Sequence, residues 1–241
     1  MTDLIALLGF GEEGWGSFLM LGTLMTVSLT LCGLLVGAVF GAAVASARLS
    51  NNKSLQVLGN TYTTIFRAIP ELLVIYLLYF GGSTLVSTIG QWFGTEGFIA
   101  TPPFLVGTLA VGVISGSYQA EVYRGAYAAI SQGEVEAARS IGMPQLMLVR
   151  RILLPQIVRL SLPGLGNVWQ MTLKDSALIS VTGLAELMRS AQIAAGSTRQ
   201  YFTFYIVAGA LYLLLTAGSN SVFSKAEYWM GRSLRRHHPA N

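Results

Sequence analysis

The side chains with the clearest chemical potential in this sequence are charged and phenolic groups set among long apolar runs. Glu121 and Arg124 are three residues apart, so on a helix they share one face and can form an ion pair. Tyr118 lies one turn earlier. Ionisable groups in such surroundings are costly and often functional, so Glu121 could instead line a passage and meet a ligand's amino or guanidinium group. Both interpretations stand at this point.

A second pair of charges, Lys174 and Asp175, interrupts another apolar stretch. Adjacent residues of a helix point to different faces, so one of them could meet the passage while the other lies near an outer interface. A lysine can extend its ammonium group to such an interface, which is the simpler interpretation of Lys174. The candidates for a substrate pathway are therefore Tyr118, Glu121, Arg124, Lys174 and Asp175.

Motifs for catalysis are absent from the sequence. It contains no G-x-x-x-x-G-K-[ST] loop for nucleotide phosphates, no H-E-x-x-H zinc motif and no C-x-x-C pair. The single Cys32 lies in an apolar run and can form no internal disulfide. We expect no catalytic residue, no metal site and no bound cofactor in this chain.

One polar segment, residues 132–156, stands out between the apolar runs. Residues 134–141 are good helix formers and carry acidic side chains in the first turn, where the helix dipole favours them. Gly142 can end that helix, and Pro144 prevents its easy continuation. The pattern predicts a short helix, a turn and a second helix, although an ordinary amphipathic loop helix would show it too.

Composition indicates what surrounds these elements. Of the 241 residues 53% are hydrophobic and 11% charged, and the mean hydropathy is +0.58, whereas soluble domains carry about 25% charged residues. A helix needs roughly 20 residues to cross a bilayer. Longer runs without any charge occur at 14–47, 72–95, 97–120 and 200–224. A further apolar stretch, 153–187, holds charges and prolines and predicts a broken or protein-buried span.

These stretches predict an all-α membrane protein with five spans, at about 20–46, 57–80, 104–128, 153–181 and 201–223. Lysines and arginines gather after the first and third of them and in the C-terminal tail, which the positive-inside rule places in the cytoplasm. The N-terminus is then periplasmic and the C-terminus cytoplasmic. This distribution explains the net charge of +4 better than a nucleic-acid partner does.

Close packing is expected along the first span. Gly33, Gly37 and Gly41 have the G-x-x-x-G spacing that lets two helices approach closely. The spacing more often marks packing within one chain than a dimer seam.

The polar segment resembles the EAA loop of binding-protein-dependent ABC permeases, with every fixed position at its spacing: Glu136, Ala137, Ala138, Gly142, Ile152, Leu154 and Pro155. The resemblance implies that the short helix is a coupling helix, which docks in a groove of a cytoplasmic ATPase. The small alanines allow close approach, and Glu136 can reach a basic or backbone donor on the partner.

The resemblance extends over nearly the whole chain. Residues 67–82, 117–126 and 162–178 are similar to the second, third and fourth spans of polar-amino-acid permeases, most closely those for histidine, lysine, arginine, ornithine and opines. It implies the type I ABC importer permease fold. Residues 1–19 would form a periplasmic segment, 20–224 the permease domain and 225–241 a cytoplasmic tail.

The implied function is import across the bacterial inner membrane of a polar amino acid, with a basic one or an opine favoured. The implied partners are ABC ATPase subunits that bind ATP and Mg, a second permease subunit (identical or a paralogue), a periplasmic amino-acid-binding protein and membrane lipid. The chain itself would not be an enzyme. The alternative is a stand-alone secondary amino-acid transporter, but the sequence shows only five spans and no visible repeat.

Overall fold

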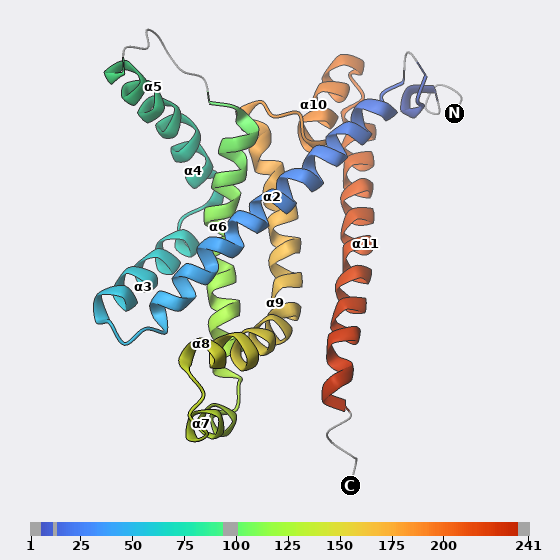
Figure 1. The fold of residues 1–241 in the computed structure, drawn as a ribbon. Helices are drawn as coiled ribbons and strands as arrows, with labels where there is room; N and C mark the ends of the chain where they lie inside the picture. The colour runs from blue at the N-terminus through green and yellow to red at the C-terminus, as the bar shows by residue number, and fades with distance from the viewer. Residues whose placement is uncertain (1–5, 12–13, 94–100, 236–241) are drawn as a thin grey trace.

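A computed structural model describes residues 6–11, 14–93 and 101–235, and no β-strand occurs in these ranges (Figure 1). The α-helices are α2 (Gly16–Arg48), α3 (Lys53–Ala68), α4 (Glu71–Tyr76), α5 (Gly82–Trp92), α6 (Pro103–Ala128), α7 (Gln132–Ser140), α8 (Gln145–Leu148), α9 (Leu154–Asp175), α10 (Leu187–Thr198) and α11 (Tyr201–Arg235). The predicted all-α fold class is confirmed.

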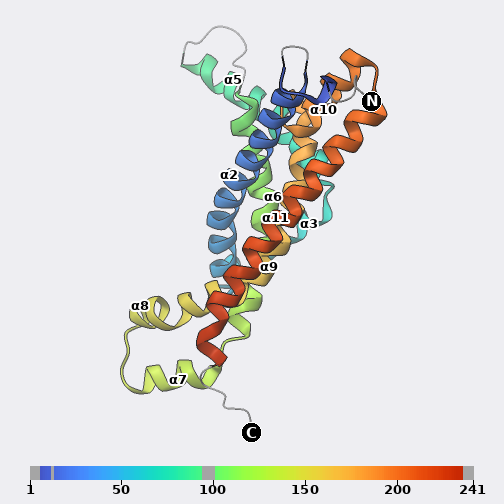
Figure 2. The same cartoon turned by 90° about the vertical axis from the view of Figure 1, so that its right-hand side faces the viewer.

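Three helical stretches are long and apolar enough to cross a membrane by themselves: Gly16–Arg48, Glu71–Ile89 and Tyr201–Met230. They contain the first predicted span, a shifted second span and the fifth. The third and fourth predicted spans correspond to α6 and α9, which carry charged residues. Figures 1 and 2 show α2, α6, α9 and α11 crossing the same layer of the molecule, with α7 and α8 at one end and α5 and α10 at the other.

The predicted second span, 57–80, is not one continuous helix. Helix α3 ends at Ala68, and Ile69 is extended, with φ −82° and ψ 136°, because a residue that precedes proline is disfavoured in the helical region. A new helix starts after Pro70 and continues through the π-helical turn Leu77–Gly81 into α5. The apolar crossing stretch therefore begins later in the chain than the sequence pattern suggested.

The predicted fourth span, 153–181, is present and changes its helical type along its length. The π-helical turn Val149–Leu153 leads into α9, which contains Pro163. At Ser176 the chain tightens into a 3-10 helix, Ser176–Thr182, which ends at Gly183 with φ 88°. The expectation of an interrupted helix is confirmed at this end.

The glycines of the first span pack against α6, as expected for packing within one chain. A Cβ atom on Gly37 would lie 2.6 Å from Nε2 of Gln119 and 3.1 Å from the carbonyl oxygen of Gly112. Nε2 of Gln119 also donates a hydrogen bond of 3.1 Å to the carbonyl of Leu34. The two backbones approach this closely because no side chain separates them.

A buried carboxylate ties the short helix α10 to the bundle. The side chain of Glu186 is 0% exposed and accepts hydrogen bonds from the backbone N–H groups of Met188, at 2.9 Å, and Arg189, at 2.7 Å. The hydroxyl groups of Thr26 in α2 and Tyr212 in α11 also donate to it, at 3.3 and 3.2 Å. Burial raises the pKa of Glu186 above its usual range, although these donors oppose the shift.

Candidate functional site

The polar segment forms the predicted helix, turn and second helix. At the end of α7 the backbone of Gly142 has φ 75°, a left-handed conformation that favours glycine. Its N–H group donates to the carbonyl of Arg139 at 2.9 Å, and the N–H of Met143 donates to that of Ala138 at 3.1 Å. Pro144 then precedes α8. The turn is closed by backbone hydrogen bonds and needs glycine at position 142.

Helix α7 presents one face to its own chain and leaves the other open. Val135 and Ala138 are 6% and 5% exposed and pack with Ile130, Leu148 and Leu153. Nε2 of Gln156 in α9 donates to Oε2 of Glu134 at 2.7 Å and fixes the helix from the side.

The remaining residues of the family pattern divide between these faces. Glu136, Ala137 and Gly142 are exposed on α7 and its turn, and so are Leu154 and Pro155 at the start of α9. Ile152 is half-buried against the core that Ala138 joins. The exposed residues are available to a partner, whereas Ala138 and Ile152 hold the loop in shape.

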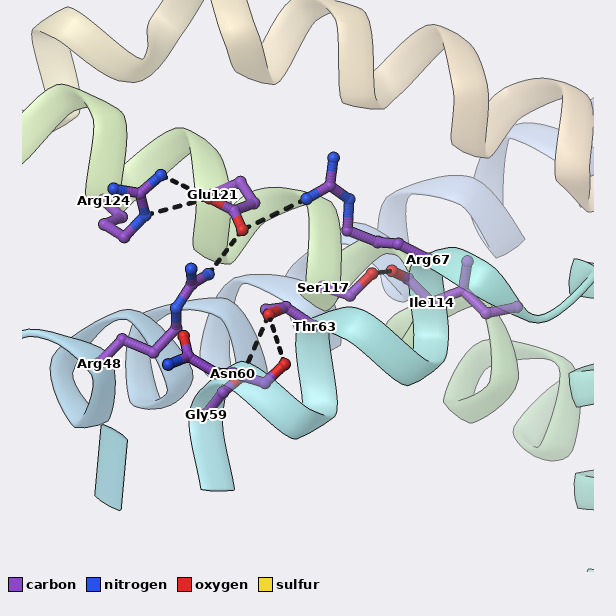
Figure 3. A network of polar contacts seen from close by, with 9 residues as sticks. All are labelled: Arg48, Gly59, Asn60, Thr63, Arg67, Ile114, Ser117, Glu121 and Arg124. Atoms are coloured by element: carbon purple, nitrogen blue, oxygen red, sulfur yellow. Dashed lines mark hydrogen bonds and ion pairs between the residues drawn. The ribbon is translucent and has the colours of Figure 1, made fainter. Parts of the chain in front are cut away.

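Three arginines surround the carboxylate of Glu121, as Figure 3 shows. Arg48 of α2 contacts Oε1 at 2.6 Å and Arg67 of α3 contacts the same oxygen at 3.3 Å. Arg124 donates to Oε2 from two nitrogens, at 3.1 and 3.0 Å. The predicted pair with Arg124 is confirmed, and α2 and α3 join it, so one carboxylate binds three helices together.

A second polar contact lies along the same side of α6. The guanidinium carbon of Arg67 lies 5.6 Å from the centre of the Tyr118 ring. The Tyr118 hydroxyl donates to Oε1 of Glu71 in α4 at 3.4 Å. Asp175, half-buried at the end of α9, lies within electrostatic reach of both Tyr118 and Glu71.

The structure thus brings four of the five candidate pathway residues to one region and leaves Lys174 apart from the ion pairs. Lys174 is exposed, while its neighbour Asp175 faces partly inward, as expected for adjacent helical positions. Sequence reasoning did not assign Arg48, Arg67 and Glu71 to this region. Arg48 and Glu121 are separated by 73 residues, and no local pattern connects them.

Replacing Glu121 by glutamine should destabilise the fold more than replacing Arg124 by glutamine. The first change leaves three guanidinium groups close together without an anion, and hydrogen bonds to charged groups are worth roughly 1.5–3 kcal/mol each. The second leaves Glu121 paired with Arg48 and Arg67. Thermal unfolding of the two purified variants would show which of them is less stable. Equal melting temperatures for Glu121→Gln and wild type would show that the cluster adds no stability.

The bundle of apolar helices, the polar contacts inside it and the exposed helix-turn-helix at one end define a membrane transport permease. The chain belongs to the family of binding-protein-dependent transport system inner membrane components, whose family model matches residues 33–225. It is a permease subunit of an ABC importer, as the following comparisons show.

Two curated relatives cover nearly the whole chain. The octopine transport system permease protein OccQ of Rhizobium radiobacter is 52% identical over 97% of this chain and 99% of its own. The histidine/lysine/arginine/ornithine transport system permease protein HisQ of Escherichia coli is 34% identical over 90% of this chain and 96% of its own. A crystal structure of an amino acid ABC transporter with histidines matches 89% of this chain and 94% of that chain, with 32% identity and a TM-score of 0.75.

Proposed function

We propose that this permease imports a cationic amino acid or an opine. The observation that carries the proposal is identity over 90% or more of the chain: 52% to a permease named for octopine and 34% to one named for histidine, lysine, arginine and ornithine. The carboxylates of Glu71 and Asp175 and the hydroxyl of Tyr118 suit a positively charged ligand, because each can accept a hydrogen bond from it.

The passage would run along the side of α6 that carries Tyr118, Glu121 and Arg124, with Asp175 beside it and Lys174 near one end. The side chains of Arg67 and Arg124 are 45% and 44% exposed. Charged side chains are costly where they face lipid. They would therefore face a water-filled path or the second permease subunit that completes it.

We further propose that the end formed by α7 and α8 is cytoplasmic and that the N-terminus is periplasmic. This orientation follows from the basic residues after the first and third spans. The exposed residues of α7 would then dock on an ATPase, which would bind ATP and Mg, while a periplasmic binding protein delivers ligand at the other end. Labelling of a cysteine at position 132 by an impermeant reagent from outside would contradict this orientation.

Uptake by the complete transporter tests the substrate. The chain, its permease partner, the ATPase and the binding protein are reconstituted in proteoliposomes, and uptake of radiolabelled octopine, arginine, leucine and glutamate is measured with and without ATP. We expect ATP-dependent uptake of octopine or arginine at least about tenfold above that of leucine or glutamate. Preferential uptake of leucine or glutamate would refute a cationic amino acid or an opine as the substrate, and uptake independent of ATP would favour a secondary transporter.

A further inference from the structure

We propose that Arg67 holds the carboxylate of the transported amino acid or opine, while the cationic end of the same molecule meets Tyr118 and Glu71. The proposal rests on the proposed function and assigns an orientation to the ligand within it. Three observations carry it: the way Arg67 is held, the excess of positive charge around it, and the acidic groups that lie next to it.

The Arg67 guanidinium is fixed in place but retains free donors. It lies over the ring of Tyr118, at 5.6 Å, and makes one contact of 3.3 Å with Glu121. A guanidinium group has five N–H donors in a rigid fork that matches a carboxylate. The side chain is 45% exposed, so donors that do not contact Glu121 can reach a ligand. A cation held by an aromatic ring loses little freedom when a carboxylate binds to it.

The three arginines of the cluster occupy different roles. Arg48 makes the shortest contact with Glu121, at 2.6 Å, and its side chain is only 13% exposed, so it neutralises that carboxylate from the inside. Arg124 binds the other oxygen through two nitrogens. Arg67 makes the longest contact. With three guanidinium groups and one carboxylate the cluster keeps two positive charges in excess, and an anion beside Arg67 would reduce this repulsion.

Groups of the opposite charge lie near the same tyrosine. The Tyr118 hydroxyl contacts Glu71 at 3.4 Å, and Asp175 lies within electrostatic reach of both. Arg67 therefore lies over the ring of Tyr118, and the carboxylate of Glu71 contacts the hydroxyl of the same residue. A cationic amino acid has the same arrangement, with a carboxylate at one end and an ammonium or guanidinium group at the other. The residues around Tyr118 therefore offer a group of opposite charge to each end of such a ligand.

Direct binding tests this orientation. Affinities of arginine and of argininamide, whose carboxylate is replaced by a neutral amide, are measured on the purified complex of permease pair and ATPase without the binding protein. We expect wild type to prefer arginine by about 10- to 100-fold, the usual worth of a hydrogen bond to a charged group. Arg67→Gln should lose this preference by weakening arginine alone, with argininamide unchanged within about twofold.

A matched control separates this role from a general loss of charge. Lys53→Gln removes an exposed cation from the same helix α3 and should keep the full preference for arginine. If Arg67→Gln does not assemble, Arg67→Lys retains the charge without the fork and should lose part of the preference for arginine.

Two outcomes would overturn the assignment while leaving the proposed function intact. One is an equal loss of affinity for both ligands in either Arg67 variant, and the other is an unchanged preference for arginine. A wild-type complex that neither binds nor transports any cationic amino acid or opine would instead overturn the proposed function, and the ligand orientation with it.

Discussion

Replacing Ala137 by aspartate is expected to release the ATPase from the transporter while the membrane bundle stays folded. Ala137 is exposed on α7, on the face that its own chain leaves open. If this face docks in a groove of the ATPase, the new carboxylate would be buried without a partner, which costs several kcal/mol. A loss of this size would weaken ATPase binding by about 100-fold or more.

Co-purification of the ATPase with tagged permease, alongside membrane abundance and ligand-stimulated ATP hydrolysis, would measure this effect. Ala128→Asp is the matched control, since Ala128 is also exposed and lies at the end of α6, just before α7. We expect Ala128→Asp to retain the ATPase. Full retention and full transport by Ala137→Asp would show that α7 is not the docking site.

Replacing Gly37 by leucine is expected to force α2 and α6 apart, and so to destabilise the bundle. A Cβ atom alone would meet the Gln119 side chain at 2.6 Å and the backbone carbonyl of Gly112 at 3.1 Å. A leucine adds three further carbons to this contact, and the backbone of α6 can yield only if the whole helix moves. Overpacking typically costs about 1–3 kcal/mol, and we expect the upper end or more.

Thermal unfolding of the purified chain in detergent, with size-exclusion chromatography, would measure this loss. Gly218→Leu is the matched control, because Gly218 is exposed on α11 and a Cβ atom there would meet nothing within 4 Å. The control should melt like wild type. A Gly37→Leu variant with the same melting temperature as Gly218→Leu would mean that the close approach of α2 and α6 contributes little to stability.

The features that the sequence predicted best are those set by local pattern. The turn at Gly142 requires a left-handed residue followed by Pro144, and both are visible in the chain itself. The glycine spacing of the first span likewise predicted close packing. The crossing helices could be predicted because the length of an apolar run is a local property of the sequence. The second span begins later than predicted, because Pro70 keeps Ile69 out of the helical conformation although the run is apolar.

Most contacts of the candidate site could not be predicted from the sequence, because they join distant parts of the chain. The pair of Glu121 and Arg124 follows from helical spacing, but Arg48 reaches Glu121 across 73 residues. Arg67 and Glu71 lie on two helices separated by Pro70, and both contact Tyr118 of α6. Such contacts depend on the angles and positions at which helices cross, and the periodicity along one helix does not specify these.

The capping carboxylate of α10 also constrains the order in which the molecule can be completed. Glu186 accepts one hydrogen bond from Thr26, a residue synthesised 160 positions earlier, and another from Tyr212, a residue synthesised 26 positions later. During synthesis, both hydrogen bonds can therefore form only after most of the chain has been made. A chain that ends before α11 would lack one donor to a buried acid, so biogenesis of α10 should finish only after the last helix has entered the membrane.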